Sequence, residues 1–204
     1  EERYRGLLTA PDARRLLASV PTYMAIDDHE IADDWDRSQA ILDPPLVDMA
    51  IGMARVHQWS HSSAADLTPA ASRAWTNSMG LVHTCRVGGE IPAIVLDTRS
   101  LRRARDGPRS ILSRRAWDHL LHWLDAHRDE PSPKLIVTGS PVAPGFACHL
   151  DAQGCLDPAS AMTADNWQAF AAERTRLFDE IRTRGMRHVV LLSGDYHCAA
   201  LATI

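Results

Sequence analysis

Short apolar runs of strand length alternate with amphipathic helical stretches along the chain, and several of the runs end abruptly in polar residues. The runs lie at residues 20–26, 91–96, 134–138 and 189–192, and the helical stretches lie at residues 11–19, 48–59, 113–127 and 167–181. Strands that alternate with helices usually form a parallel sheet that the helices cover. The sequence therefore predicts an α/β fold, organised as one domain over residues 1–204.

Local signals refine this prediction. A Gly-Gly turn between residues 81–86 and 91–96 predicts an antiparallel hairpin. The last helix is expected to begin after a cap at Thr163 or Asp165 and to end at Gly185. The apolar positions at helical spacing in the stretch 48–59, which predict an amphipathic helix there, are Met49, Met53, Val56 and Trp59.

The composition disfavours several classes of protein. The chain carries 22 basic and 26 acidic residues, a net charge of −4, and so lacks the basic field that holds a nucleic-acid backbone. No apolar run approaches the ~20 residues of a membrane-spanning helix. The four cysteines show no CxxC spacing, which argues against a zinc knuckle or a dithiol redox motif and leaves the redox compartment open. Neither a nucleic-acid partner nor a membrane segment is expected.

Two loops combine carboxylate and imidazole side chains directly after apolar runs. They are residues 27–30 (Asp-Asp-His-Glu) and residues 194–197 (Gly-Asp-Tyr-His). Taken singly, the first is also compatible with a helix cap and the second with a simple turn. Closely packed acids repel each other unless a cation lies between them, and several divalent metals accept both carboxylate and imidazole ligands. Together the two loops favour a metal site.

Three segments resemble, in the same order, those of the PhoD-like alkaline phosphatases, a branch of the calcineurin-like metallophosphoesterases. They are residues 20–35 (VPTYMAIDDHEIADDW), 96–100 (LDTRS) and 191–197 (LLSGDYH), and the likeness extends over almost the whole chain. The resemblance implies a four-layer α/β/β/α sandwich whose strand-end loops hold two metal ions. It also implies hydrolysis of small phosphoric monoesters or diesters by a metal-activated hydroxide. The implied metals are iron with calcium, or zinc or manganese, and the oligomeric state is left open.

The resemblance assigns roles to four residues. Asp28 takes the metal-ligand position that Asn holds in the related Gly-Asn-His-Glu motif, and His29 is the histidine that assists phosphoryl transfer. Asp195 and His197 occupy the ligand positions of the last motif. Asp28, Asp195 and His197 are the expected metal ligands, and His29 is expected to stabilise the leaving oxygen, either as a general acid or as a charged donor.

Arg99, in the middle motif, has two interpretations. Its guanidinium either binds the substrate phosphate as a bidentate fork or forms a structural salt bridge with Asp97 or another acid. The sequence does not choose between them.

The chain departs from the family pattern before residue 27. The first two metal motifs of the family, an Asp-X-His/Cys-like strand end and a Gly-Asp-X-X-Tyr/Asp loop, are not found there. We therefore interpret the sequence as a partial domain that carries roughly the C-terminal half of the metal site. A non-catalytic protein that keeps the fold and at most one metal, and an enzyme of another metal-assisted hydrolysis, are alternative functions. The family is commonly exported, but no leader pattern is visible and the compartment is left open.

Overall fold

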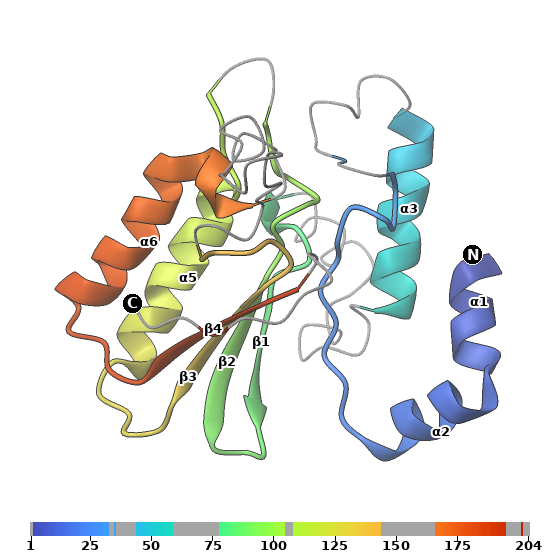
Figure 1. Ribbon diagram of the computed structural model, residues 1–204, viewed down its shortest axis with the longest axis horizontal. Helices are drawn as coiled ribbons and strands as arrows, with labels where there is room; N and C mark the ends of the chain where they lie inside the picture. The colour runs from blue at the N-terminus through green and yellow to red at the C-terminus, as the bar shows by residue number, and fades with distance from the viewer. Residues whose placement is uncertain are drawn as a thin grey trace, which may run out of the picture.

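The structure is a computed structural model that describes residues 2–32, 35, 44–58, 78–104, 108–143, 166–194 and 201 (Figure 1). Within these residues the strands form one four-stranded sheet in the order β1-β2-β3-β4. The strands are β1 (His83–Val87), β2 (Ile91–Leu96), β3 (Lys134–Thr138) and β4 (Val189–Ser193). The helices are α1 (Glu2–Thr9), α2 (Pro11–Ser19), α3 (Pro44–His57), α5 (Arg114–His127), the 3-10 helix η5 (Trp167–Phe170) and α6 (Ala171–Thr183). The predicted mixed α/β class is confirmed.

The last three strands of the sheet run parallel. Leu96 of β2, Thr138 of β3 and Ser193 of β4 are register partners, so all three strands end at one edge. β1 is antiparallel to β2, and the turn between them uses Gly88 and Gly89 at φ values of 61° and 80°, where a side chain would be strained. The predicted hairpin is confirmed. The loops after β2, β3 and β4 leave from the edge where open α/β sheets bind their ligands.

The main hydrophobic core lies between one face of the sheet and the helices α5 and α6 (Figure 1). Ile94, Leu96 and Ile136 of the sheet are fully buried in it. Ser113 caps α5 by accepting the N–H of Ala116 at 3.1 Å, and the helix then presents its apolar face to the sheet. The side chains that α5 buries are Ala116, Trp117, Leu120, Trp123 and Leu124. The helix expected at residues 113–127 is confirmed.

A second, smaller core lies on the other side of the sheet. It is formed by Ile26, Ala54 of α3 and Leu81, and Figure 1 shows α3 on the side away from α5 and α6. Ile26 is the last residue before the acidic loop. This small core therefore fixes the point at which the N-terminal segment reaches the sheet.

The prediction of a strand at residues 20–26 is wrong. This segment runs outside any strand of the described chain. Pro21 has no N–H to donate, and Val20 and Tyr23 are exposed, so the segment lacks both a complete set of ladder donors and a buried face. Only its end, at Ile26, is fully buried.

The helix around residues 48–59 is confirmed as α3, but the residues that it buries differ from the expected stripe. Met49 is 61% exposed and Val56 is also exposed, whereas Val47 and Ala54 are buried. The small side chain of Ala54 lets α3 approach Ile26 closely. Met53 is half-buried and Trp59 lies outside the described residues, so two of the three described positions of the expected stripe face solvent.

The two caps expected for the last helix, Thr163 and Asp165, lie outside the described residues. The 3-10 helix η5 directly precedes α6 and is capped by Asn166. The side-chain oxygen of Asn166 accepts the N–H groups of Gln168 and Ala169. The expected end at Gly185 is confirmed, since this residue has a φ of 62° and follows the cap residue Arg184.

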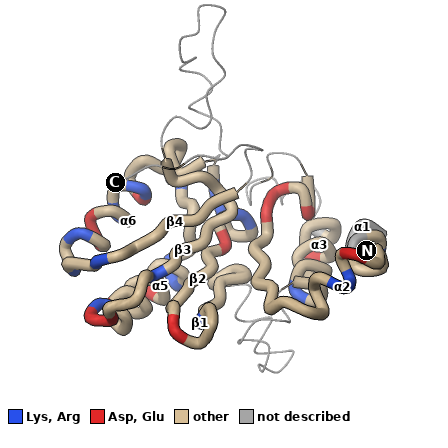
Figure 2. The backbone as a smooth tube through the Cα atoms, turned by 60° about the horizontal axis from the view of Figure 1, so that its bottom comes forward, with Lys and Arg blue, Asp and Glu red and all other residues tan. Residues whose placement is uncertain are grey.

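Charges of both signs are interspersed on the surface of α5 and α6 (Figure 2). Arg184, after α6, reaches Asp125 of α5 at 2.8 Å and so links the two helices. In the described parts of the chain, none of the helices combines the length and the apolar character that crossing a membrane requires.

An ion-pair cluster at the opposite edge of the sheet gives a pH-dependent contribution to stability. Glu130 Oε1 lies 2.7 Å from Arg86 Nη2 and 2.7 Å from His127 Nδ1. The hydrogen bonds from Arg86 and then His127 lower the pKa of Glu130 from 4.5 to about 2. The folded state favours the ionised carboxylate of Glu130. The contribution of this carboxylate to the free energy of unfolding is therefore fully present above pH 4.5 and is lost as the pH falls towards about 2.

We therefore expect the Glu130→Gln variant to be less stable than the wild type at neutral pH, by the small amount typical of exposed ion pairs. Urea unfolding of both proteins should show this difference shrinking as the pH falls from 4.5 towards about 2. A difference that stays constant over this range would contradict the lowered pKa.

Candidate active site

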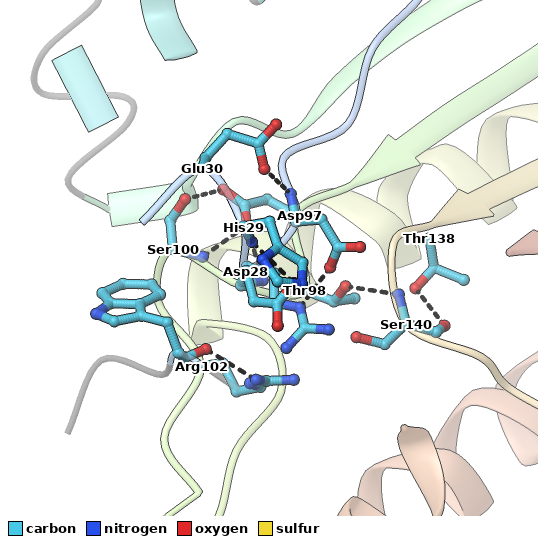
Figure 3. A network of polar contacts seen from close by, with 12 residues as sticks. Asp28, His29, Glu30, Asp97, Thr98, Ser100, Arg102, Thr138 and Ser140 are labelled. Atoms are coloured by element: carbon cyan, nitrogen blue, oxygen red, sulfur yellow. Dashed lines mark hydrogen bonds and ion pairs between the residues drawn. The ribbon is translucent and has the colours of Figure 1, made fainter. Parts of the chain in front are cut away.

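The acidic motif of residues 27–30 forms a tight turn near the edge at which the parallel strands end (Figure 3). The carbonyl of Asp28 accepts the N–H groups of Ile31 and Ala32, both at 2.8 Å. No helix begins at His29, so the motif does not act as a helix cap. The turn instead presents its side chains to the loops that follow the strands.

Two carboxylates of the motif hold the turn in place. Asp27 Oδ1 lies 2.6 Å from Nε of Arg99, in the turn after β2. Glu30 Oε2 accepts the N–H of Asp27 at 2.8 Å, and Glu30 Oε1 accepts Nε2 of Gln58, directly after α3, at 2.8 Å. Asp27 thus connects the turn to β2, and Glu30 connects it to α3.

The other two residues of the motif, Asp28 and His29, differ sharply in exposure. Asp28 is 2% exposed, and its Oδ1 accepts the backbone N–H of His29 at 2.8 Å. His29 itself is exposed. A buried carboxylate is a suitable metal ligand because a cation compensates its desolvation, and an exposed imidazole is accessible to a substrate. One turn therefore offers an anionic oxygen ligand and a proton donor side by side.

Asp97, the first residue after β2, organises the neighbouring turn (Figure 3). Its Oδ1 accepts the N–H groups of Arg99 and Ser100 at 2.9 Å and 2.8 Å. Its Oδ2 accepts the N–H of Leu81 at 2.6 Å and the hydroxyl of Ser100. Gly80, at a φ of 73°, is needed beside it, because a Cβ there would lie 2.5 Å from Oδ2. With four hydrogen bonds from the protein, this buried carboxylate is a structural anchor.

The loop after β3 contacts both turns. Ser140 N donates to Thr98 Oγ1 at 3.2 Å. A Cβ on Gly139 would lie 3.1 Å from the carbonyl oxygen of Ile26 and 3.7 Å from Oδ1 of Asp27, so glycine permits a close approach here. Three segments that are far apart in the sequence therefore meet at the end of the parallel strands.

The structure brings together three of the residues that the sequence singled out, namely Asp28, His29 and Arg99. Arg99 forms an ion pair with Asp27, which agrees with the salt-bridge interpretation. Asp195 and His197 lie outside the described residues, and β4 ends at Ser193 on this same edge. In the described ranges, no group of three or more His, Cys, Asp or Glu side chains is placed to hold a metal ion.

Sequence reasoning did not foresee how the site is supported. Glu30, Thr98 and Ser140 bind neighbouring loops, and none of them was singled out for that role. One signal was present in the sequence, since Asp97 begins a polar segment directly after an apolar run. The partners of these side chains are distant in sequence and appear only with the fold.

Comparison with known proteins identifies the family and the fold of the chain. A family model of PhoD-like phosphatases matches residues 1–204, and the chain belongs to this family. A solved structure of PhoD is similar to the chain with a TM-score of 0.56 and 18% sequence identity. The match covers 83% of this chain and 33% of that chain, so the chain spans about a third of the length of that structure. At this identity the likeness shows the fold. No curated protein matches the chain.

Proposed function

We propose that the protein is a metal-dependent hydrolase of phosphoric monoesters or diesters. Membership of the PhoD-like phosphatase family supports phosphoester hydrolysis in general. The observation that carries the proposal to particular residues is the pairing of a buried Asp28 carboxylate with an exposed His29 imidazole at the ligand-binding edge of the sheet. The two groups lie in one turn, which the side chains of Asp27 and Glu30 hold in place.

The proposal includes two metal ions, held by Asp28, Asp195 and His197. The chemistry of the donor set fits, because carboxylate oxygen and imidazole nitrogen together suit iron, zinc or manganese, and carboxylates alone suit calcium. The burial of Asp28 fits as well, since an ionised carboxylate at 2% exposure gains from a nearby cation. When bound, such ions neutralise the charge of the phosphate and activate the attacking water.

In this proposal His29 protonates the oxygen of the leaving group. Its imidazole is exposed and can meet a substrate that enters from solvent. Its backbone N–H donates to Asp28 Oδ1 at 2.8 Å, so the orientation of the acid is tied to that of the ligand. Phosphoryl transfer depends mainly on positioning and on electrostatic stabilisation, and a short turn held by hydrogen bonds and an ion pair would supply the positioning.

The proposal is tested by measuring metal content together with turnover of three esters of p-nitrophenol. These are the phosphomonoester, the phosphodiester and the acetate. We expect the purified protein to hydrolyse at least one of the two phosphoric esters, to lose this activity when a chelator removes the metal, and to regain it when metal is restored.

The other outcomes identify the alternatives. Hydrolysis of the acetate alone would indicate a different metal-assisted hydrolase. Bound metal with no turnover of any ester, or neither metal nor turnover, would indicate a protein that keeps the fold without catalysis. Activity that survives complete removal of metal would exclude the proposed chemistry.

A further inference from the structure

We infer that Arg99 and Arg102 clamp the two ends of the acidic loop, residues 27–35, and thereby set the positions of Asp28 and His29. Both arginines lie in the segment that follows β2, and both are fully buried. The inference rests on the proposed function. It gives Arg99 a positioning role, in place of contact with the substrate phosphate.

The first contact of the clamp is at the start of the loop. Nε of Arg99 lies 2.6 Å from Oδ1 of Asp27, and the Arg99 side chain is 0% exposed while that of Asp27 is 30% exposed. Such a short, charge-assisted contact fixes the carboxylate firmly. Asp27 directly precedes Asp28, so this ion pair restrains the backbone on one side of the proposed ligand. The guanidinium is covered by protein and does not present a face to solvent, from which a substrate arrives.

The second contact is at the other end of the loop (Figure 3). Nη2 of Arg102 donates to the carbonyl of Trp35 at 2.8 Å. Trp35 is buried, and its backbone N–H donates to the carbonyl of Ala32 at 3.1 Å. Arg102 therefore holds the backbone where the chain leaves the turn that carries Asp28 and His29.

The segment that carries the two arginines is itself held firmly. Asp97 accepts the N–H groups of Arg99 and Ser100, and Arg102 N donates to the carbonyl of Arg99 at 3.2 Å. Burial of an arginine is costly unless acceptors compensate the lost hydration. Because the loop supplies an acceptor to each of the two guanidinium groups, a shift of the loop would remove that contact from each buried charge. The clamp therefore favours one position of the loop.

The test compares the wild type with Asp27→Asn and Arg102→Lys, using hydrogen exchange and steady-state kinetics at saturating metal. Asp27→Asn keeps a side-chain oxygen and changes a partly exposed group, so it is suited to carry the test if Arg102→Lys does not fold. We expect faster exchange at the amides of residues 29–32 in both variants. We also expect kcat to fall about 10–100-fold, as is usual when outer partners of a metal site are removed, with little change in KM.

The matched control is Arg86→Gln, which removes an Arg–carboxylate pair at the opposite edge of the sheet. It should leave exchange in the loop and kcat as in the wild type. Unfolding curves of all variants show whether they are folded. Unchanged exchange and unchanged kcat in Asp27→Asn would overturn the inference.

A fourth variant, Arg99→Lys, separates positioning from phosphate binding. A positioning role predicts a lower kcat, faster loop exchange and unchanged inhibition by inorganic phosphate. Weaker inhibition by phosphate and a raised KM, with normal loop exchange, would show instead that Arg99 binds the substrate. If the wild type hydrolyses no phosphoric ester, the proposed function fails, and the exchange data alone decide whether the clamp exists.

Discussion

Replacement of His29 by alanine should slow the hydrolysis of phosphoric esters by about 10²–10⁴-fold and leave the bound metal in place. The expected loss is that of a general acid. The contact between this residue and Asp28 is made by the backbone N–H of residue 29, which alanine retains. The proposed ligand should therefore keep its position, and the effect should appear in kcat. Measurement of kcat and of metal content in the same preparation tests both parts of the prediction.

The leaving group provides a sharper measurement of the same role. An acid that protonates the leaving oxygen matters most when that oxygen belongs to a weakly acidic alcohol, so the loss in His29→Ala should be larger for alkyl phosphates than for p-nitrophenyl phosphate. His122→Ala is a suitable control, because His122 is an exposed histidine on α5 whose Nδ1 lies 2.8 Å from the Asp118 carbonyl of the same helix. Equal rates for His29→Ala and the wild type would exclude the acid role.

The parts of the fold that depend on local pattern could be predicted from the sequence. The Gly88-Gly89 turn, the helix over residues 113–127 and the end of the last helix at Gly185 depend on patterns of a few residues, and these predictions hold. The stretch at residues 20–26 has the same apolar composition as a strand, yet whether it pairs depends on its neighbours in space. The face of α3 depends in the same way on Ile26 and Leu81, which are distant in sequence.

The candidate site shows the same limit. The grouping of Asp28 with His29 is local, and it could be read from the motif. The partner of Arg99 could not, because Asp27 lies 72 residues earlier in the chain and several acids were equally possible. The role of Gly139 is also hidden from the sequence, since it consists of leaving room for the Ile26 carbonyl. The sequence therefore indicated which residues form the candidate site, whereas the contacts that hold them in place appear only with the fold.

Replacement of Asp28 by alanine should weaken metal binding by more than about 100-fold, because loss of even an outer partner of a metal site typically costs 10–100-fold. Asp28 is a buried carboxylate beside His29, and alanine removes its proposed oxygen ligand together with the acceptor for the backbone N–H of His29. Titration of the metal-free protein with each candidate metal, followed calorimetrically, measures the change. Phosphoester hydrolysis at low metal concentration should fall in parallel.

Asp28→Asn is the matched control, and it makes the prediction specific. Asparagine keeps a side-chain oxygen that can accept the N–H of His29 and can bind a metal, and it is the residue that the related Gly-Asn-His-Glu motif carries at this position. We therefore expect Asp28→Asn to retain metal and most of the activity, so that the loss in Asp28→Ala is due to the missing oxygen. If the Asp28→Ala variant bound metal as tightly as the wild type, Asp28 would not be a ligand. If the Asp28→Asn variant bound metal as weakly as Asp28→Ala, the negative charge of Asp28 would be essential for binding. The proposed equivalence of Asp28 to the asparagine of the related motif would then be wrong.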